Sequence, residues 1–258
     1  MTGDARQDDW AIQVESAWLS FRVKHDRPTT IKEMVVRMLR GRGRGYSEEL
    51  FWALQDVSFT VRRGERLGVI GPNGSGKTTL LSLIANIYPP DKGHVTTRGR
   101  TVGLLGLGVG FDPEMTGREN IYLNASLFGL TRRAIDERID DIIAFADIGD
   151  FIDAPVRTYS TGMATRVGFA VAAHIDADIL LLDEVLAVGD AEFRQKSMAR
   201  TLGLRDAGRT LILVSHDLSA VSEMCHRAIW LEHGRIVESG PVDEVVQAYE
   251  RRYAPAPA

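Results

Sequence analysis

The stretch GPNGSGKT, residues 71–78, decides the fold of this chain. It follows the apolar run RLGVI (66–70) and leads into TTLLSLIANI (78–87), so the order is strand, glycine-rich loop, helix. This order and the spacing G-x-x-x-x-G-K-[ST] are typical of a loop whose backbone N–H groups surround phosphate oxygens. The pattern predicts a nucleoside triphosphate site in an α/β protein.

The polar residues of this loop have predicted roles. Lys77 is expected to reach the β- and γ-phosphates, and the Thr78 hydroxyl is expected to ligate Mg²⁺. The other expected nucleotide-binding residues are Gly71, Asn73, Gly74, Ser75, Gly76 and Thr79. On the helix that follows, Leu80, Leu83, Ile84 and Ile87 are expected to share one buried face.

Two later apolar runs, ADILLLDE (177–184) and RTLILVSHD (209–217), are typical of parallel strands buried on both faces. Both end in polar residues, and the carboxyl ends of parallel strands share one edge of a sheet. We therefore expect Asp183 to hold Mg²⁺, Glu184 to polarise the attacking water, and His216 to approach the γ-phosphate. A chance pair of surface carboxylates and a structural histidine are the alternatives.

The stretch TYSTGMATR (158–166) predicts a helix entered through Ser160-Thr161-Gly162. The first turn of a helix leaves N–H groups unpaired and carries the positive end of the helix dipole, which suits an anion. An ordinary Ser/Thr cap explains the same residues, and the stretch alone does not decide between the two.

Together these features resemble the ATP-binding subunits of ABC transporters. The order is the phosphate loop, YSTGM (159–163), LLLDE (180–184), Asp190 in LAVGD and SHD (215–217), within about residues 12–250. The resemblance implies ATP and Mg²⁺ as ligands and a homodimer whose two domains meet head to tail. One protomer then caps the γ-phosphate held by the other, with Asp190 at the dimer interface. The capping residues are Ser160, Thr161, Gly162 and Met163.

Three stretches narrow this resemblance. YSTGM stands where the family usually has Leu-Ser-Gly-Gly-Gln, and it is similar to the variant found in exporters of bacterial surface polysaccharides. The stretches LLGLGVGFDPEMTGREN (104–120) and FWALQDVSF (51–59) also resemble stretches of those exporters. The implied function is ATP hydrolysis that drives a lipid-linked polysaccharide through a separate permease. A drug or peptide exporter subunit and a soluble ABC ATPase are the alternatives. No glutamine stands near Leu107, where the wider family has a Mg²⁺ contact.

The family stacks adenine on an aromatic residue at the end of its first strand. Phe21 matches this position best, ahead of Trp18, Tyr46 and Trp52. Because aromatic stacking tolerates any base, the choice of ATP rests on the resemblance.

Residues 24–50 form a longer connection than a hairpin needs. Thr30 could cap a short amphipathic helix there, with Ile31, Met34, Val35 and Met38 on one face. A solvated basic loop and an RNA contact are alternatives for its arginines, whereas the resemblance places the helix close to the membrane partner. There the basic residues could meet anionic lipid or glycan headgroups. The arginines are Arg37, Arg40, Arg42 and Arg44.

Composition excludes several classes of protein. The 258 residues are 44% apolar and 26% charged with a net charge of −4, as in a soluble globular protein, and nucleic acid is not an expected partner. The single cysteine fits a reducing compartment, the acidic N-terminus is unlike a secretory signal, and no apolar run reaches 18 residues. With the resemblance, the expected location is peripheral, on the cytoplasmic face of the inner membrane.

The expected fold class is α/β: a P-loop ABC ATPase core with a mixed β-sheet, an antiparallel β subdomain and a helical subdomain at about 106–173. Residues 1–253 would form a single nucleotide-binding domain, followed by a disordered tail (254–258) and no C-terminal carbohydrate-binding domain. Within it we expect a hairpin turn at His233-Gly234 and a last helix from Pro241. Thr131 is expected to cap one helix that buries Ile135, Ile139, Ile142 and Ile143.

Overall fold

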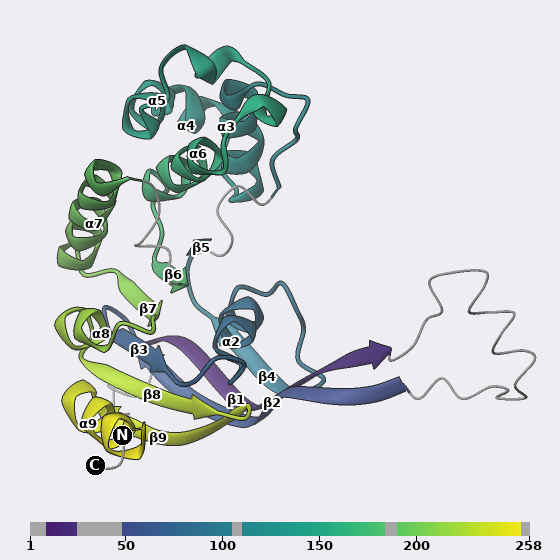
Figure 1. The fold of residues 1–258 in the computed structure, drawn as a ribbon, viewed down its shortest axis with the longest axis vertical. Coiled ribbons are helices and arrows are strands. Elements are labelled where there is room, and N and C mark those ends of the chain that lie inside the picture. Colours follow the sequence, from purple (N-terminus) through teal and green to yellow (C-terminus); the bar gives the residue numbers. More distant parts are fainter. Residues whose placement is uncertain (1–8, 25–47, 105–109, 184–189, 254–258) are drawn as a thin grey trace, which may run out of the picture.

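The computed structural model describes residues 9–24, 48–104, 110–183 and 190–253. Two sheets make up its lower part, and a lobe of helices lies above them (Figure 1). The smaller sheet is antiparallel in the order β2-β1-β4. Its strands β1 and β2 have 15 residues each and pair along most of their length. Its strands are β1 (Trp10–Lys24), β2 (Glu48–Arg62) and β4 (Lys92–Thr97).

The larger sheet has the order β5-β6-β7-β3-β8-β9, in which all neighbouring pairs are parallel except β8 and β9. The predicted hairpin turn at His233-Gly234 is confirmed, with the two positive φ angles, 48° and 74°, that a tight two-residue turn requires. The predicted mixed sheet is thereby confirmed. Its strands are β3 (Arg66–Ile70), β5 (Thr101–Leu104), β6 (Ile179–Asp183), β7 (Thr210–Val214), β8 (Arg227–Glu232) and β9 (Arg235–Pro241).

The two sheets are joined by one hydrophobic core, into which α2 (Lys77–Ile84) also packs. Leu80, Leu83 and Ile84 of this helix are buried as predicted, but the helix ends at Ile84 and Ile87 is 56% exposed. The prediction for Ile87 was wrong because Asn86 adopts a positive φ of 57° and two prolines follow at 89 and 90, which a helix cannot continue through.

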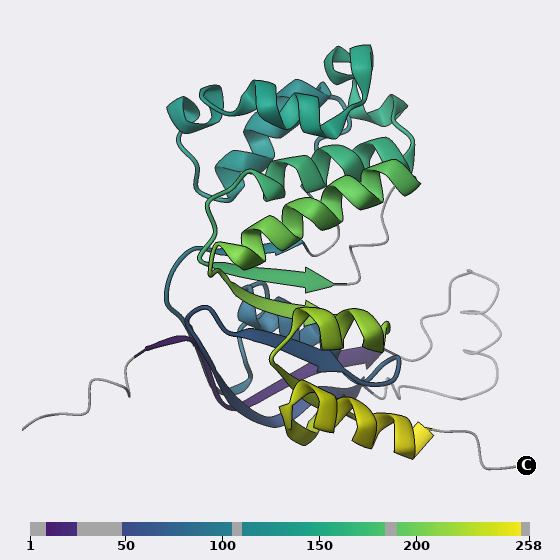
Figure 2. The ribbon, with the colours of Figure 1, turned by 90° about the vertical axis from the view of Figure 1, so that its left-hand side faces the viewer.

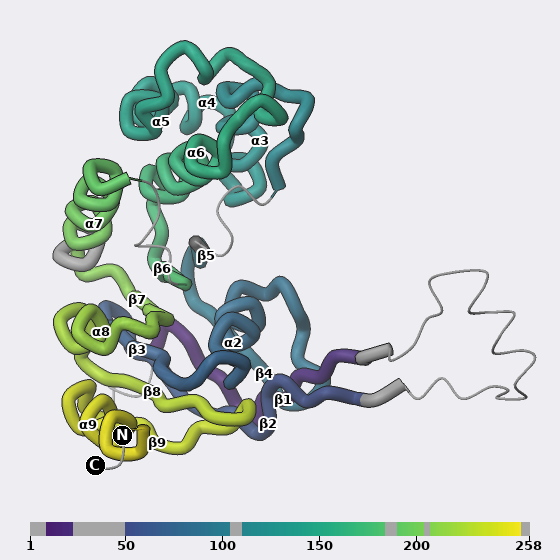
Figure 3. The backbone as a smooth tube through the Cα atoms, viewed as in Figure 1, coloured from purple at the N-terminus to yellow at the C-terminus, as the bar shows by residue number. Residues whose placement is uncertain are grey.

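The helical lobe is inserted between β5 and β6, which are neighbours in the sheet (Figures 1 and 3). The chain rises from β5 into the lobe and returns through α6 to β6. Figure 2 shows α7 (Ala191–Asp206) running beside α6 on the flank of the lobe. The elements of the lobe are α3 (Gly117–Leu127), α4 (Arg132–Asp136), α5 (Ile139–Ala146), the 3-10 turns η1 (Gly149–Asp153) and η2 (Val156–Thr158), and α6 (Thr161–Ala173).

The single helix predicted after Thr131 is in fact two helices. Thr131 does cap α4, since its side chain accepts from the Ala134 N–H over 3.3 Å. The chain then leaves helical geometry at Arg138, whose guanidinium donates to the Asp176 carboxylate over 3.0 Å, and α5 begins with Ile139. Ile135, Ile139 and Ile142 are buried as predicted, whereas Ile143 is only partly buried.

Two short helices complete the described part: α8 (Leu218–Met224), and α9 (Val242–Tyr253), which begins directly after Pro241. Of the 24–50 connection the structure describes only the strand ends, so its predicted helix and arginines lie outside the described residues, as do Tyr46 and the tail 254–258. Across the described ranges, no helix combines the length and apolar composition needed to span a membrane.

A buried amide fixes the loop that opens the helical lobe. The Asn120 side chain on α3 is fully buried, and its oxygen accepts from the Asp112 N–H over 2.7 Å. Its nitrogen donates to the carbonyls of Asp112, Met115 and Thr116 over 2.9, 3.2 and 2.9 Å. One side chain therefore satisfies four backbone groups of residues 112–116.

We expect Asn120→Leu to lower the free energy of unfolding by about 2 kcal/mol or more, because the Asp112 N–H loses its acceptor and each of the three carbonyls loses one of its two donors. Urea unfolding followed by circular dichroism measures this change. The matched control is Ser126→Leu at an exposed position of the same helix, which should change stability by less than about 0.5 kcal/mol. Equal effects of the two substitutions would show that the amide does not hold the loop.

Candidate functional site

Glycines set the path of the loop between β3 and α2. Gly71, Gly74 and Gly76 have φ angles of 148°, 77° and 104°, which other residues rarely adopt. A Cβ at Gly71 would lie 2.0 Å from the carbonyl oxygen of Leu231, and one at Gly76 would lie 2.6 Å from that of Ala53. Only glycine therefore fits at these two positions, and the loop can curl with its backbone N–H groups available to an anion.

Lys77 is the first residue of α2 and is buried. Its ammonium donates to the carbonyl oxygens of Gly71 and Pro72 over 2.7 and 3.0 Å, so it lies across the mouth of the loop. A cation and the N-terminus of a helix are thus directed at the same volume, which favours a multiply charged phosphate there.

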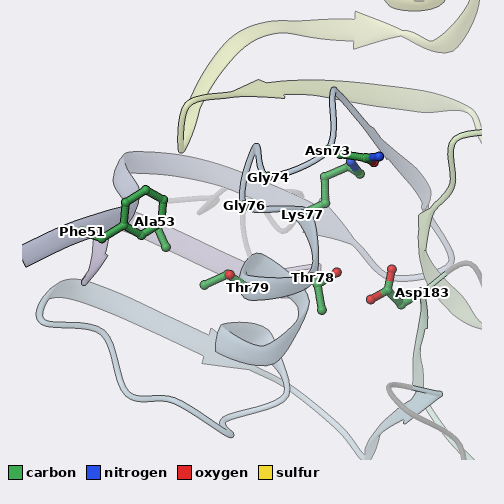
Figure 4. Close-up of a pocket in the computed structure, with 9 residues that line it drawn as sticks. All are labelled: Phe51, Ala53, Asn73, Gly74, Gly76, Lys77, Thr78, Thr79 and Asp183. Atoms are coloured by element: carbon green, nitrogen blue, oxygen red, sulfur yellow. The ribbon is translucent and has the colours of Figure 1, made fainter. Parts of the chain in front are cut away.

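A cavity of about 470 Å³ opens beside this loop, within the usual size of a small-ligand site. Figure 4 shows Lys77, Thr78 and Asp183 toward one end of it and the ring of Phe51 at the other. The structure therefore brings together residues from β2, the loop, α2 and the end of β6. The lining residues are Phe51, Ala53, Asn73, Gly74, Gly76, Lys77, Thr78, Thr79 and Asp183.

The donors in this cavity suit Mg²⁺. The Thr78 hydroxyl and the Asp183 carboxylate are hard oxygen ligands, and Mg²⁺ is commonly held by one or two protein oxygens together with phosphate and water. Among the described residues no group of three or more His, Cys, Asp or Glu side chains gathers for a metal, so a cage made by protein alone is not formed there. The residues present fit a magnesium ion that arrives with a nucleotide.

The other predicted catalytic residues are His216 and Glu184. His216 follows β7, which lies between β6 and β3, so it is placed at the edge that carries Asp183 and the phosphate loop. It is exposed and does not line the cavity. Glu184 lies outside the described residues.

Ser160 is the N-cap of α6, and its side-chain oxygen accepts from the Met163 N–H over 3.2 Å. Ser160, Thr161 and Gly162 are exposed, and Met163 is half-buried. None of them lines the cavity beside the phosphate loop of the same chain. The ordinary capping role is therefore present, and these four residues lie outside the cavity beside their own phosphate loop.

Asp190 caps α7, since its Oδ1 accepts from the Phe193 N–H over 3.0 Å, and its other oxygen pairs with Arg166 of α6. The hydrogen bond from the Phe193 backbone, followed by the Arg166 charge, holds the pKa of Asp190 below its usual value. Arg166 was missed by sequence reasoning, because its partner is 24 residues away and no local pattern pairs them.

The aromatic residue at the cavity is Phe51, which sequence reasoning also missed. Phe21, the predicted base-stacking residue, instead packs edge-on against Tyr88 with ring centroids 5.5 Å apart. Phe51 pairs with Phe21 across β1 and β2, is 53% exposed and lines the cavity. The hairpin pairing of the two strands was the signal that could have found it. The lesser candidates, Trp18 and Trp52, pack against each other at 5.4 Å.

A glycine-rich loop between a buried parallel strand and a helix, with an aspartate at the end of a second buried strand of the same sheet, defines a P-loop nucleotide-binding protein. The chain belongs to the ABC transporter family, whose sequence pattern matches residues 54–187.

Named relatives are similar over most of this chain. The O-antigen export system ATP-binding protein RfbB of Myxococcus xanthus is 44% identical over 250 residues, 96% of this chain and 57% of that protein. A Klebsiella pneumoniae protein of the same name is 43% identical over 247 residues, 94% of this chain and 98% of that one. The teichoic acids export ATP-binding protein TagH of Levilactobacillus brevis is 45% identical over 199 residues, 77% and 55% of the two chains. This chain thus spans little more than half of two of these relatives.

Solved structures show the same fold at low sequence identity. The ATP-binding cassette MJ0796, determined as a dimer in a post-hydrolysis state with ADP and phosphate, superposes with a TM-score of 0.69 at 20% identity over 90% of this chain and 98% of that one. The structure of an ATP-binding subunit of an ABC transporter superposes with a TM-score of 0.71 at 20% identity over 95% of both chains. The predicted fold class is therefore confirmed.

We expect Phe51→Ala to weaken ATP binding about tenfold, because stacking a base on an aromatic ring contributes about 1–3 kcal/mol. Phe51→Trp should keep the affinity, since it keeps a ring of the same kind. Isothermal titration of the purified chain with ATP measures both. Phe151→Ala, at an equally exposed ring in the helical lobe, is the matched control. A greater loss of affinity in Phe21→Ala than in Phe51→Ala would identify Phe21, the residue predicted from the sequence, as the stacking residue.

Proposed function

We propose that this chain is the ATP-hydrolysing subunit of an ABC exporter that drives a lipid-linked surface polysaccharide across the cytoplasmic membrane through a separate permease. The observation that carries the ATPase role is the shared cavity of Lys77, Thr78 and Asp183. The polysaccharide class is supported by relatives named for O-antigen and teichoic acid export. The relatives named above do not carry names that would favour an exporter of drugs or peptides or a soluble ABC ATPase.

The chain's own groups bind and orient the nucleotide. The loop N–H groups and Lys77 neutralise the phosphates, and Phe51 covers the base end of the cavity. Mg²⁺, held by Thr78 and Asp183, would supply positive charge to the phosphate oxygens. The remaining loop residues, Gly71, Asn73, Gly74, Ser75, Gly76 and Thr79, shape the loop and supply the other nucleotide contacts.

Glu184 is proposed as the general base. It directly follows Asp183, which lines the phosphate end of the cavity, and we propose that its carboxylate orients a water and accepts its proton. His216, at the same sheet edge, is proposed to contact the γ-phosphate. Hydrolysis then needs no covalent intermediate, since the water attacks the γ-phosphorus and ADP leaves.

The complete site is proposed to need two copies of the chain. Ser160, Thr161, Gly162 and Met163 stand outside their own cavity, so in a head-to-tail homodimer they cap the phosphate held by the partner. Asp190 is proposed at the same dimer interface. The permease, also in two copies, would hold the dimer at the cytoplasmic face of the inner membrane, with no nucleic acid involved. The arginines of the 24–50 connection are proposed to act on the membrane side.

Glu184→Gln should keep ATP binding but lower the turnover number by about 10²–10⁴-fold, because glutamine keeps the size of the side chain and loses its basicity. The variant should also accumulate as an ATP-dependent dimer, visible by size-exclusion chromatography with light scattering. Glu192→Gln, at an exposed position at the start of α7, is the control and should hydrolyse ATP normally. Near-normal turnover in Glu184→Gln would remove this residue from the role of base.

Gly162→Asp should abolish hydrolysis and leave ATP binding by the monomer unchanged, because the new carboxylate repels the partner's γ-phosphate. The fold accepts the side chain, since a Cβ at Gly162 meets nothing nearer than the Ser160 Oγ at 3.8 Å. Gly162→Asn is the matched uncharged control and should lose less activity.

The same variant tests the head-to-tail arrangement. Mixing Gly162→Asp with Lys77→Ala protein should restore part of the activity, because one composite site then joins an intact phosphate loop to an intact Ser160 segment. Neither variant alone has such a site. An inactive mixture, or loss of ATP binding by the Gly162→Asp monomer, would show that the segment serves its own chain.

A further inference from the structure

Arg166 lies in the second turn of α6, and its side chain is only 18% exposed. Its guanidinium meets three groups at once. One nitrogen donates to the Asp147 carbonyl over 2.9 Å, the other pairs with the Asp190 carboxylate, and the central carbon lies 5.0 Å from the centre of the Phe193 ring. The side chain therefore joins α6 to the end of α5 and to the start of α7.

This arrangement requires arginine. A planar guanidinium offers several fixed donors and a face that stacks on an aromatic ring, whereas a lysine ammonium is a single flexible point of charge. The ring below it is also fixed, because Phe193 is buried against Phe145 and Phe169 with centroid distances of 5.8 and 5.9 Å. The position of Arg166 is thus set by packing as well as by charge.

Asp190 has a separate partner for each carboxylate oxygen. Oδ1 accepts from the Phe193 N–H and starts α7, while Oδ2 binds Arg166. Both partners favour the ionised carboxylate. Asp190 follows the cavity residue Asp183 closely in sequence, and the pair with Arg166 fixes the start of α7.

We propose that Arg166 is a positioning residue for hydrolysis: it ties the start of α7, at Asp190, to the helix that begins at Ser160. This inference rests on the proposed function and applies to the dimer. When the Ser160 end of α6 meets the partner's phosphate, the displacement of α6 is passed through the guanidinium to Asp190. Asp190, which we place at the dimer interface, is then held in position by the helix that meets the partner's phosphate.

The test compares Arg166→Met, Asp190→Asn and the double variant. Asparagine at 190 keeps an oxygen for the Phe193 N–H, so the helix cap survives while the charge pair is lost. Each single variant should lower the turnover number about tenfold while the KM for ATP changes by less than about twofold. The turnover number of the double variant should be no lower than that of the single variants, because all three lack the same ion pair. Arg166→Lys should recover little.

A second ion pair in the same lobe is the matched control. Arg118 and Asp153 join α3 to η1 over 2.8 Å, and Arg118→Met and Asp153→Asn should leave turnover unchanged. Thermal unfolding is measured for every variant. If Arg166→Met does not fold, the turnover number of Asp190→Asn alone tests the positioning role.

Losses that multiply in the double variant, or losses in proportion to the unfolded fraction, would overturn the positioning role. Wild-type turnover in Asp190→Asn would also overturn the positioning role, but it would not contradict the proposed ATPase function. A wild-type chain that binds ATP and hydrolyses none, even as a dimer, would overturn the ATPase proposal and this inference together.

Discussion

Close packing of backbone around the Ala53 carbonyl holds the phosphate loop in place, and the arrangement of the site depends on it. A Cβ at Gly76 would lie 2.6 Å from this oxygen, and one at Gly234 would lie 2.5 Å from it. The loop, β2 and the β8–β9 turn therefore meet with no side chain between them. Any larger residue at either glycine would separate the sheet that carries Phe51 from the loop that carries Lys77, and the cavity between them would open.

Strand order then connects this loop to the helical lobe. β6 lies two strands from β3, with β7 between them, so the ends of all three strands meet at the edge where Asp183 and Lys77 share a cavity. The lobe is inserted between β5 and β6, and the chain re-enters the sheet from α6 directly into β6. The lobe is therefore directly continuous with the strand whose last residue is Asp183.

Sequence reasoning found the parts whose causes are local. The phosphate loop, the apolar strands and the turn at His233-Gly234 follow from residue types within a few positions of one another. It failed where a distant partner decides, as at Arg138, which leaves helical geometry toward Asp176, 38 residues away. Phe51 and Arg166 were missed for the same reason, because strand pairing and helix packing give them their neighbours. The end of α2 before Pro89 was a local signal that was overlooked.

Gly162 has no role inside the monomer that its surroundings show. It is the second residue of α6, where glycine forms a helix less readily than alanine. Neither of the usual reasons for glycine applies, since its φ is not positive and a Cβ would have room. The monomer therefore gives no reason for its presence. Close approach of another group to the exposed backbone of this first turn would give one, and the proposed head-to-tail dimer would bring a phosphate to that place.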